Sequence, residues 1–295
     1  MSSSGHRAFS LGRIAAITAN TFTELTRLKA LYVLLFFALL LIGNSIFMAQ
    51  LTFQEEFQVL KDIALGSMSI FTSLLAVVAT ARLIPQDLEA RTLYTILAKP
   101  VARGEYLLGK LAGVLLLLAA SVIIMSALFF IVLKVREQTV ISETMRQMHA
   151  SPSDQMAEAL AGVRAAAFNV NLLSGIGIIY VKACLLAALT LFVSTFATTT
   201  IFTTVLMVFV YFIGHLQSTA REYWLQANSA GWPTKVFLAL VALLFPDLQL
   251  FNLVDDIVAG TAIPLALFAQ TATLGFFYTG FYLLLAWAVF YRKEI

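Results

Sequence analysis

Residues 107–133 read LLGKLAGVLLLLAASVIIMSALFFIVL, and Lys110, near the start, is the only charged residue in the stretch. A helix crosses the hydrocarbon core of a bilayer with about 20 apolar residues, so this stretch is long enough to span a membrane. The rest of the chain has the same character, since 60% of its 295 residues are hydrophobic and 12% are charged. A typical soluble domain has about 25% charged residues, which excludes a soluble globular protein. The composition predicts an all-α membrane protein.

Five other apolar stretches are long enough, or nearly long enough, to be further spans. The apolar segment Val236–Phe245 is shorter, at about ten residues, and is followed by Pro246 and Asp247. It is therefore expected to be a short external or re-entrant segment before the last span. The six predicted spans cover residues 30–49, 63–84, 107–133, 172–197, 199–217 and 263–290, within a single domain of residues 1–295.

The distribution of basic residues predicts the orientation. Six spans place both termini on one side of the membrane. Of the 19 lysines and arginines, 11 fall on the side of the termini, 7 on the opposite side, and Lys182 within a span (11 + 7 + 1 = 19). Loops rich in Lys and Arg stay in the cytoplasm, so both termini are expected there. The basic residues form no compact run, so no nucleic-acid partner is expected.

Three segments between the spans carry helical patterns. Residues 9–29 alternate apolar and charged positions at helical spacing, which predicts an amphipathic helix along the cytoplasmic membrane surface. Pro85 and Pro100 bound a second amphipathic helix, predicted over residues 86–98. Its mixture of charges and apolar anchors suits docking of a cytoplasmic partner, although a solvated loop is an alternative. A small external helix is predicted over residues 152–168.

The chain shows no motif for catalysis or cofactor binding. It lacks the phosphate-binding loop G-x-x-x-x-G-K-[ST], as well as H-E-x-x-H and G-x-S-x-G. With one cysteine and three widely separated histidines, it shows no zinc-ligand pattern. We therefore expect no enzymatic activity, no catalytic residue, no metal site and no bound cofactor in this chain. His215 is interpreted as a capped or interfacial residue rather than a catalyst.

Lys182 is the ionisable residue placed well inside a predicted span. Such residues usually face a cavity or a partner helix, because a charge at the bilayer centre costs about 2.5–3.5 kcal/mol. The alternative is that the side chain snorkels to the interface. Asn44 and Gln270 are milder cases, and each is expected to hydrogen-bond between helices.

The stretch LEARTLYTILAKPVARGEYLLGKLAG, residues 88–113, resembles the signature of type-2 ABC transporter permeases. These proteins typically have an acidic residue before a Thr-Leu pair, then a proline and a basic residue, then Y-x-x-G-K entering the third span. Many members have glycine immediately before the Thr-Leu pair, where this chain has Arg91. The elbow-like helix 9–29, STFATTT, FPDLQLFNLVDD and the basic tail RKEI are similar to the family as well. The matching positions are Glu89, Thr92, Leu93, Pro100, Arg103, Tyr106, Gly109 and Lys110.

The resemblance implies the membrane-spanning permease subunit of an ATP-driven exporter in a bacterial cytoplasmic (inner) membrane. Its partners would be the lipid bilayer, a second permease chain, identical or different, and two ATPase subunits that bind ATP and Mg. Residues 85–105 would contain the coupling helix that docks on the ATPase. The implied coupling residues are Leu88, Glu89, Arg91, Thr92, Leu93, Pro100 and Arg103. The alternatives are an ATP-independent secondary transporter or channel and, disfavoured by the missing motifs, an intramembrane enzyme.

Overall fold

The computed structural model of the chain describes residues 10–50, 56–89, 102–147, 153–169, 171–226, 232–233, 236, 246–258 and 263–292. All regular secondary structure in these residues is helical, and no strand occurs among them. The helices are α1 (Leu11–Thr26), α2 (Lys29–Gln50), α3 (Glu56–Ala81), α4 (Leu83–Glu89), α6 (Arg103–Gln147), α7 (Ser153–Ala167), α8 (Asn171–Phe196), α9 (Thr200–Gln226), the 3-10 helix η1 (Leu248–Phe251), α11 (Val254–Val258) and α12 (Leu265–Arg292).

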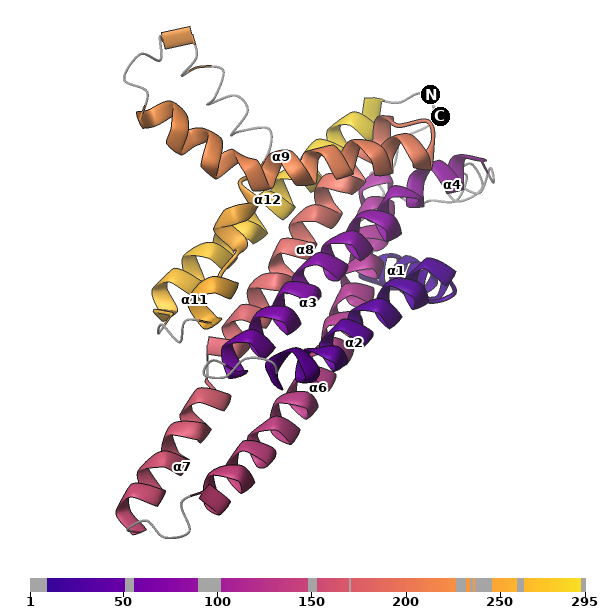
Figure 1. Cartoon of the computed structure of the whole chain (residues 1–295). Coiled ribbons are helices and arrows are strands. Elements are labelled where there is room, and N and C mark those ends of the chain that lie inside the picture. Colours follow the sequence, from indigo (N-terminus) through magenta and orange to yellow (C-terminus); the bar gives the residue numbers. More distant parts are fainter. Residues whose placement is uncertain are drawn as a thin grey trace, which may run out of the picture.

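Six of the helical stretches are long and apolar enough to cross a membrane, and each overlaps one predicted span over most of its length. Helix α8 lies at the centre of the bundle, between α3, α6 and α12 (Figure 1). Its residues are apolar on every side, which is typical of a helix buried all round. The outer helices α2 and α12 instead expose large apolar side chains, as a lipid-facing surface requires. The described residues therefore confirm the all-α fold with six helices that are long and apolar enough to span a membrane.

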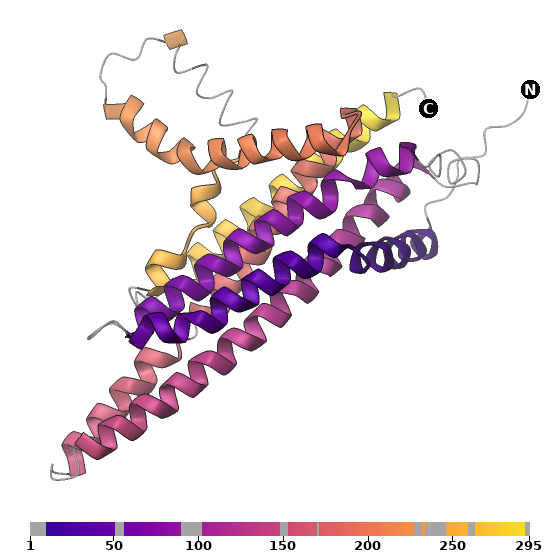
Figure 2. The ribbon, with the colours of Figure 1, turned by 45° about the vertical axis from the view of Figure 1, so that its right-hand side comes forward.

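Helix α9 differs from the other long helices in direction. Figures 1 and 2 show that α9 crosses the other long helices at a large angle. Those helices run roughly alongside one another, and they are α2, α3, α6, α8 and α12. One face of α9 packs on α3, α8 and η1. The opposite face is apolar and exposed along the helix, which suits contact with lipid or another chain. This face includes Ile201, Phe202, Val205, Phe209, Phe212 and Leu216.

The helix that contains the third predicted span is longer than the span. Helix α6 continues past residue 133 to Gln147 and pairs with α7 in a hairpin that projects from the bundle (Figure 2). At about 1.5 Å per residue, a helix of 45 residues is more than twice as long as a bilayer core is thick. Residues 134–147 contain no Gly or Pro, so the charges that end the apolar stretch do not end the helix.

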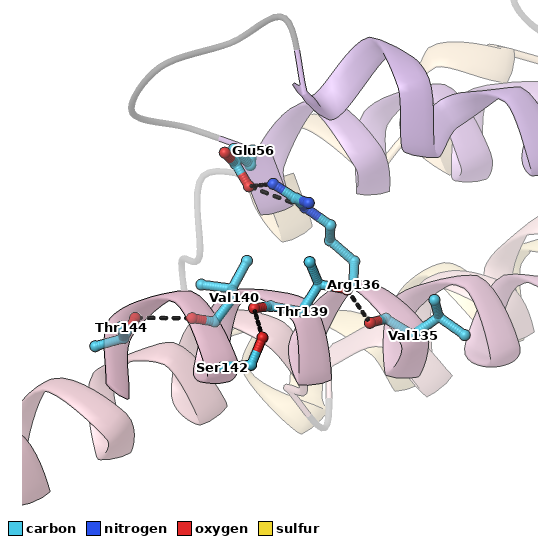
Figure 3. A network of polar contacts seen from close by, with 7 residues as sticks. All are labelled: Glu56, Val135, Arg136, Thr139, Val140, Ser142 and Thr144. Carbon is cyan, nitrogen blue, oxygen red and sulfur yellow. Dashed lines mark hydrogen bonds and ion pairs between the residues drawn. The ribbon is translucent and has the colours of Figure 1, made fainter. Parts of the chain in front are cut away.

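Polar contacts tie the projecting hairpin to the start of α3. Figure 3 shows the guanidinium of Arg136, on α6, donating to the carboxylate of Glu56 at the first residue of α3. The ammonium of Lys61, one turn further along α3, donates to the carbonyl oxygen of Ala166 at 2.6 Å. Ala166 lies in the last turn of α7, where carbonyl groups lack helical partners. The two contacts fix both arms of the hairpin to α3.

The segment before the last helix packs inside the bundle. Residues 246–258, which contain η1 and α11, contact α3, α8 and α9. Gly275 on α12 leaves room for this packing, since a Cβ there would lie 2.2 Å from Val181 Cγ1 and 2.9 Å from Phe251 Cε1. Whether the segment is re-entrant or external stays a prediction. Most of Val236–Phe245 lies outside the described residues.

Candidate functional site

The start of the predicted coupling segment is a short helix that follows a break at Arg82. Helix α3 ends at Ala81 and α4 begins at Leu83, so the expectation that the helix begins after Pro85 is wrong. Pro85 lacks the N–H that would continue α3, but as third residue of α4 it needs no helical donor. The Arg82 guanidinium bridges the break by donating to Gln86 Oε1 at 2.8 Å.

Three of the seven predicted coupling residues fall within the described part of the chain. Leu88 is half-buried against the core, and Glu89, the last residue of α4, is exposed. Four of the predicted residues lie outside the described residues, namely Arg91, Thr92, Leu93 and Pro100. Arg103 lies at the first turn of α6, and its guanidinium donates to the carbonyl oxygens of Phe290 and Tyr291 at 2.9 and 2.7 Å. Arg103 therefore caps the C-terminal end of α12.

A buried polar network joins α4 to the third predicted span. The ammonium of Lys110, 3% exposed, lies 2.7 Å from the Asp87 carboxylate and 3.6 Å from that of Glu24. The Tyr106 hydroxyl donates to the same Asp87 oxygen at 2.5 Å. Asp87 lies at the start of the predicted coupling segment, Lys110 and Tyr106 lie on α6, and Glu24 lies on α1. The network therefore couples the position of α4 to that of α6 and α1.

Helix α1 is held against the start of α6 by a second ion pair. The Arg13 guanidinium donates to both carboxylate oxygens of Glu105, which also accepts the backbone N–H groups of Ser10 and Ala102. Glu105 precedes the predicted span, and the bond from Arg13 lowers the pKa of its carboxyl group to about 2. Close packing reinforces the pair. A Cβ on Gly109 would lie 2.7 Å from the Ile17 side chain.

A helix is therefore present where the sequence predicts an amphipathic one. Its contacts with α6 show that α1 is attached to the bundle, whereas its position along a membrane surface stays a prediction. The start of α1, the start of α6 and the end of α12 lie at one end of the molecule, as the contacts of Arg13 and Arg103 require (Figure 1).

Lys182 lies in the interior of the bundle, which rules out the snorkelling alternative for this structure. Its side chain is 2% exposed and its ammonium donates to Ser69 Oγ on α3 at 3.4 Å. On α9, His215 Nε2 lies 3.1 Å from the ammonium, and the Tyr211 ring centroid lies 5.6 Å away. His215 Nδ1 lies 2.9 Å from the carbonyl oxygen of Tyr211. A carbonyl only accepts, so Nδ1 carries the proton and Nε2 offers its lone pair to Lys182.

Asn44 and Gln270 do not join this cluster. Both side chains are exposed on the outside of the single chain, on α2 and α12. The hydrogen bonds expected between helices are therefore not formed by these residues within the described chain. Gln270 instead lines a shallow surface pocket of about 480 Å³ with Thr273 and Phe277.

Three residues take part in these networks although the sequence did not predict their contacts. His215 was interpreted as a capped or interfacial residue, and Asp87 and Glu105 were not distinguished from other loop charges. Each is paired with a residue distant in sequence on another helix, such as His215 with Lys182 or Glu105 with Arg13. No spacing within one segment signals such a pair.

The chemistry available to the described residues is ionic and hydrogen-bonding. No group of three or more His, Cys, Asp or Glu side chains suited to a metal ion occurs in the described part of the chain. A comparison with protein-family models finds no matching family. A comparison with curated proteins finds no significant match. The assignment of a function therefore depends on the residues themselves.

Proposed function

We propose that this chain is the membrane-spanning permease subunit of an ATP-driven exporter of the ABC type-2 class. The residue resemblance over residues 88–113 motivates the proposal. The observation that supports it is the buried pairing of Asp87 with Lys110. Asp87 lies near the start of the candidate coupling segment, and Lys110 lies where the third predicted span begins. A push on that segment by a cytoplasmic ATPase would reach α6 and α1 through this network.

In this proposal ATP and Mg bind the partner ATPase, and two permease chains assemble in a bacterial cytoplasmic membrane. The exposed apolar faces of α2 and α9 offer room for the second chain. Arg103, by capping α12, carries the same movement to the last predicted span. The substrate crosses between helices, while this chain performs no chemical step.

Affinity purification of the tagged chain from its native membranes, in a mild detergent, tests the proposal. The purified material should contain a second polypeptide with a phosphate-binding loop and should hydrolyse ATP. The chain purified without that polypeptide should not hydrolyse ATP. Substrate movement by the chain alone in liposomes, without ATP, would contradict the proposal.

A second candidate is an ATP-independent transporter, and the Lys182–His215 pair favours it. Ionisable residues inside a membrane often mark substrate or proton paths in such proteins. The liposome experiment separates the two candidates. A secondary transporter needs an ion gradient and no ATPase, whereas the exporter needs ATP hydrolysis and no gradient.

A further inference from the structure

Lys182 and Lys110 are both buried, but the charges around them differ. The Lys110 ammonium has the carboxylates of Asp87 and Glu24 beside it. Among the described residues, no carboxylate lies within salt-bridge distance of the Lys182 ammonium. Its partners there are a hydroxyl, an imidazole lone pair and an aromatic face. An ammonium has three donors, so one donor has no hydrogen-bond acceptor among these partners, and no carboxylate in the described part of the chain balances the positive charge.

A second polar group without a partner in the described part of the chain, the Thr72 hydroxyl, lies on the same face of α3 as Ser69. Ser69 and Thr72 are three residues apart on α3, so they share a helix face. The Thr72 hydroxyl is fully buried and has no hydrogen-bond partner among the described residues. A buried polar group without a partner costs free energy and calls for an explanation. A ligand with acceptor oxygens between α3 and α8 would satisfy it.

The elements around Lys182 include backbone that is not α-helical. Residues 246–253 pack against α8 and α9, and the Pro246 carbonyl oxygen lies 3.0 Å from where a Cβ of Gly214 would be. Irregular backbone among membrane spans occurs where protein buries it or where it lines a cavity. Broken segments beside ionisable residues mark substrate sites in other transporters. Helix α9 forms the outer wall, and its His215 and Tyr211 are only half-buried.

We propose that Lys182 binds the anionic headgroup, a phosphate or a carboxylate, of an amphiphilic substrate whose apolar tail stays in the bilayer. This inference is built on the proposed function and names its substrate class. A headgroup oxygen replaces His215 Nε2 as the acceptor of the Lys182 ammonium, and α9 moves outward with His215. Ser69 and Thr72 supply neutral donors from α3.

Asp247 is the acidic group of η1 that faces this region. Its carboxylate accepts the backbone N–H of Gln249 at 3.1 Å, which fixes it at the start of η1, and it interacts electrostatically with His215. The negative charge of Asp247 repels an anion that approaches from η1. The headgroup therefore approaches Lys182 from α3, on the side of Ser69 and Thr72.

Calorimetric titration of the full-length chain in dodecyl maltoside tests the site without an ATPase. The probe is dodecyl phosphate, and inorganic phosphate is titrated in parallel. The wild type should bind dodecyl phosphate, and Lys182→Met should weaken binding by about tenfold or more, because a hydrogen bond to a charged group is lost. Lys182→Arg, which keeps the charge, should stay within about threefold of the wild type. His215→Leu should bind at least as tightly as the wild type, because it removes a competing acceptor.

Lys61→Met is the matched control, because Lys61 is also buried but donates to a backbone carbonyl far from this site. Size-exclusion profiles verify that each variant is folded. Equal affinity of the wild type and Lys182→Met would overturn the inference, as would an equal loss in Lys61→Met. Equally tight, Lys182-dependent binding of inorganic phosphate would overturn the amphiphile assignment. If an ATPase co-purifies and binding is independent of Lys182, only this inference fails. If no ATPase co-purifies, the proposed exporter fails while the binding result stands.

Discussion

The ammonium of Lys110 lies 2.7 Å from the carboxylate of Asp87, and both side chains are buried. Asp87 belongs to the short helix α4 and Lys110 to the second turn of α6, so the pair joins the helix before residues 90–101 to the helix after them. A displacement of α4 relative to α6 would therefore break a buried ion pair.

Asp87→Asn should destabilise the chain by about 3 kcal/mol, because it leaves the buried Lys110 charge without its closest partner. Lys110→Met should also destabilise it, by stranding the Asp87 carboxylate. The double variant should recover part of the loss, since neither charge is then unpaired. Thermal unfolding of the four proteins in detergent measures the coupling. Purely additive losses would show that the pair contributes no interaction energy.

Glu105→Gln should loosen α1 from α6 at neutral pH, since it removes the negative partner of Arg13. The pKa of Glu105 is lowered from 4.5 to about 2, chiefly by the hydrogen bond from Arg13. A carboxyl group whose pKa is lowered by folding stabilises the folded state at any pH above its unfolded pKa. This stability is lost as the pH falls through the pKa of the folded state. Wild-type α1 should therefore stay protected from hydrogen exchange at about pH 4, where this carboxylate is still ionised.

Amide exchange in residues 11–26, corrected for intrinsic rates, measures the attachment of α1. Thr23→Ala is the control, because the Thr23 side chain is exposed on α1 and bonds only to its own helix at Ala19. It should leave the exchange pattern unchanged. Loss of wild-type protection between about pH 6 and pH 4 would contradict the assignment of the Glu105 pKa to the bond with Arg13.

The sequence predicts those parts of the fold that depend on apolar length. Each of the six predicted spans overlaps a long helical stretch of the structure, because about 20 apolar residues need a helix to satisfy their backbone in lipid. The ends of the helices are predicted less well. Helix α6 runs past Leu133 to Gln147. Charged residues end the apolar stretch that could lie in lipid, but a helix ends only where residues of low helix propensity or a C-cap stop it.

The candidate site is harder to predict because it depends on packing between distant segments. Lys182 stands out in the sequence as a charge in an apolar stretch, but its contact with His215 requires the crossing of α8 and α9. Asp87 looks like one of several loop charges, and only the fold shows that it meets Lys110. Asn44 and Gln270 also stand out in the sequence as polar residues in apolar stretches, yet both side chains are exposed on the outside of the chain.

Reporter fusions should place Ile295 in the cytoplasm and Met148 on the opposite side. The prediction depends on the excess of basic residues on the side of the termini and on an odd number of spans between the two fusion points. The tip of the α6–α7 hairpin then projects away from the cytoplasm. A phosphatase reporter, active outside, and a fluorescent reporter, active inside, should give opposite results at the two positions. The same result at both would contradict the six-span topology.

Glu89→Ala, Arg91→Ala and Leu93→Ala should weaken binding of the partner ATPase or uncouple its ATP hydrolysis from transport. Loss of one charge of a docked pair costs about 2 kcal/mol or more when its partner is left buried. A solvated surface charge costs within about 0.5 kcal/mol. Pull-down of the ATPase and substrate-stimulated hydrolysis in reconstituted membranes measure the two effects, while the spans still insert.

Glu143→Ala separates docking at residues 86–98 from a general effect of charge. Glu143 is exposed like Glu89, but it lies near the far end of α6, in the projecting hairpin. Its removal should leave ATPase binding and hydrolysis unchanged, because a cytoplasmic partner cannot reach it in the predicted topology. If all three coupling variants behave like Glu143→Ala, the segment is a solvated connector. The Asp87–Lys110 pair would then brace α4 against α6 without transmitting any movement, and the exporter proposal would lose the contact that carries it.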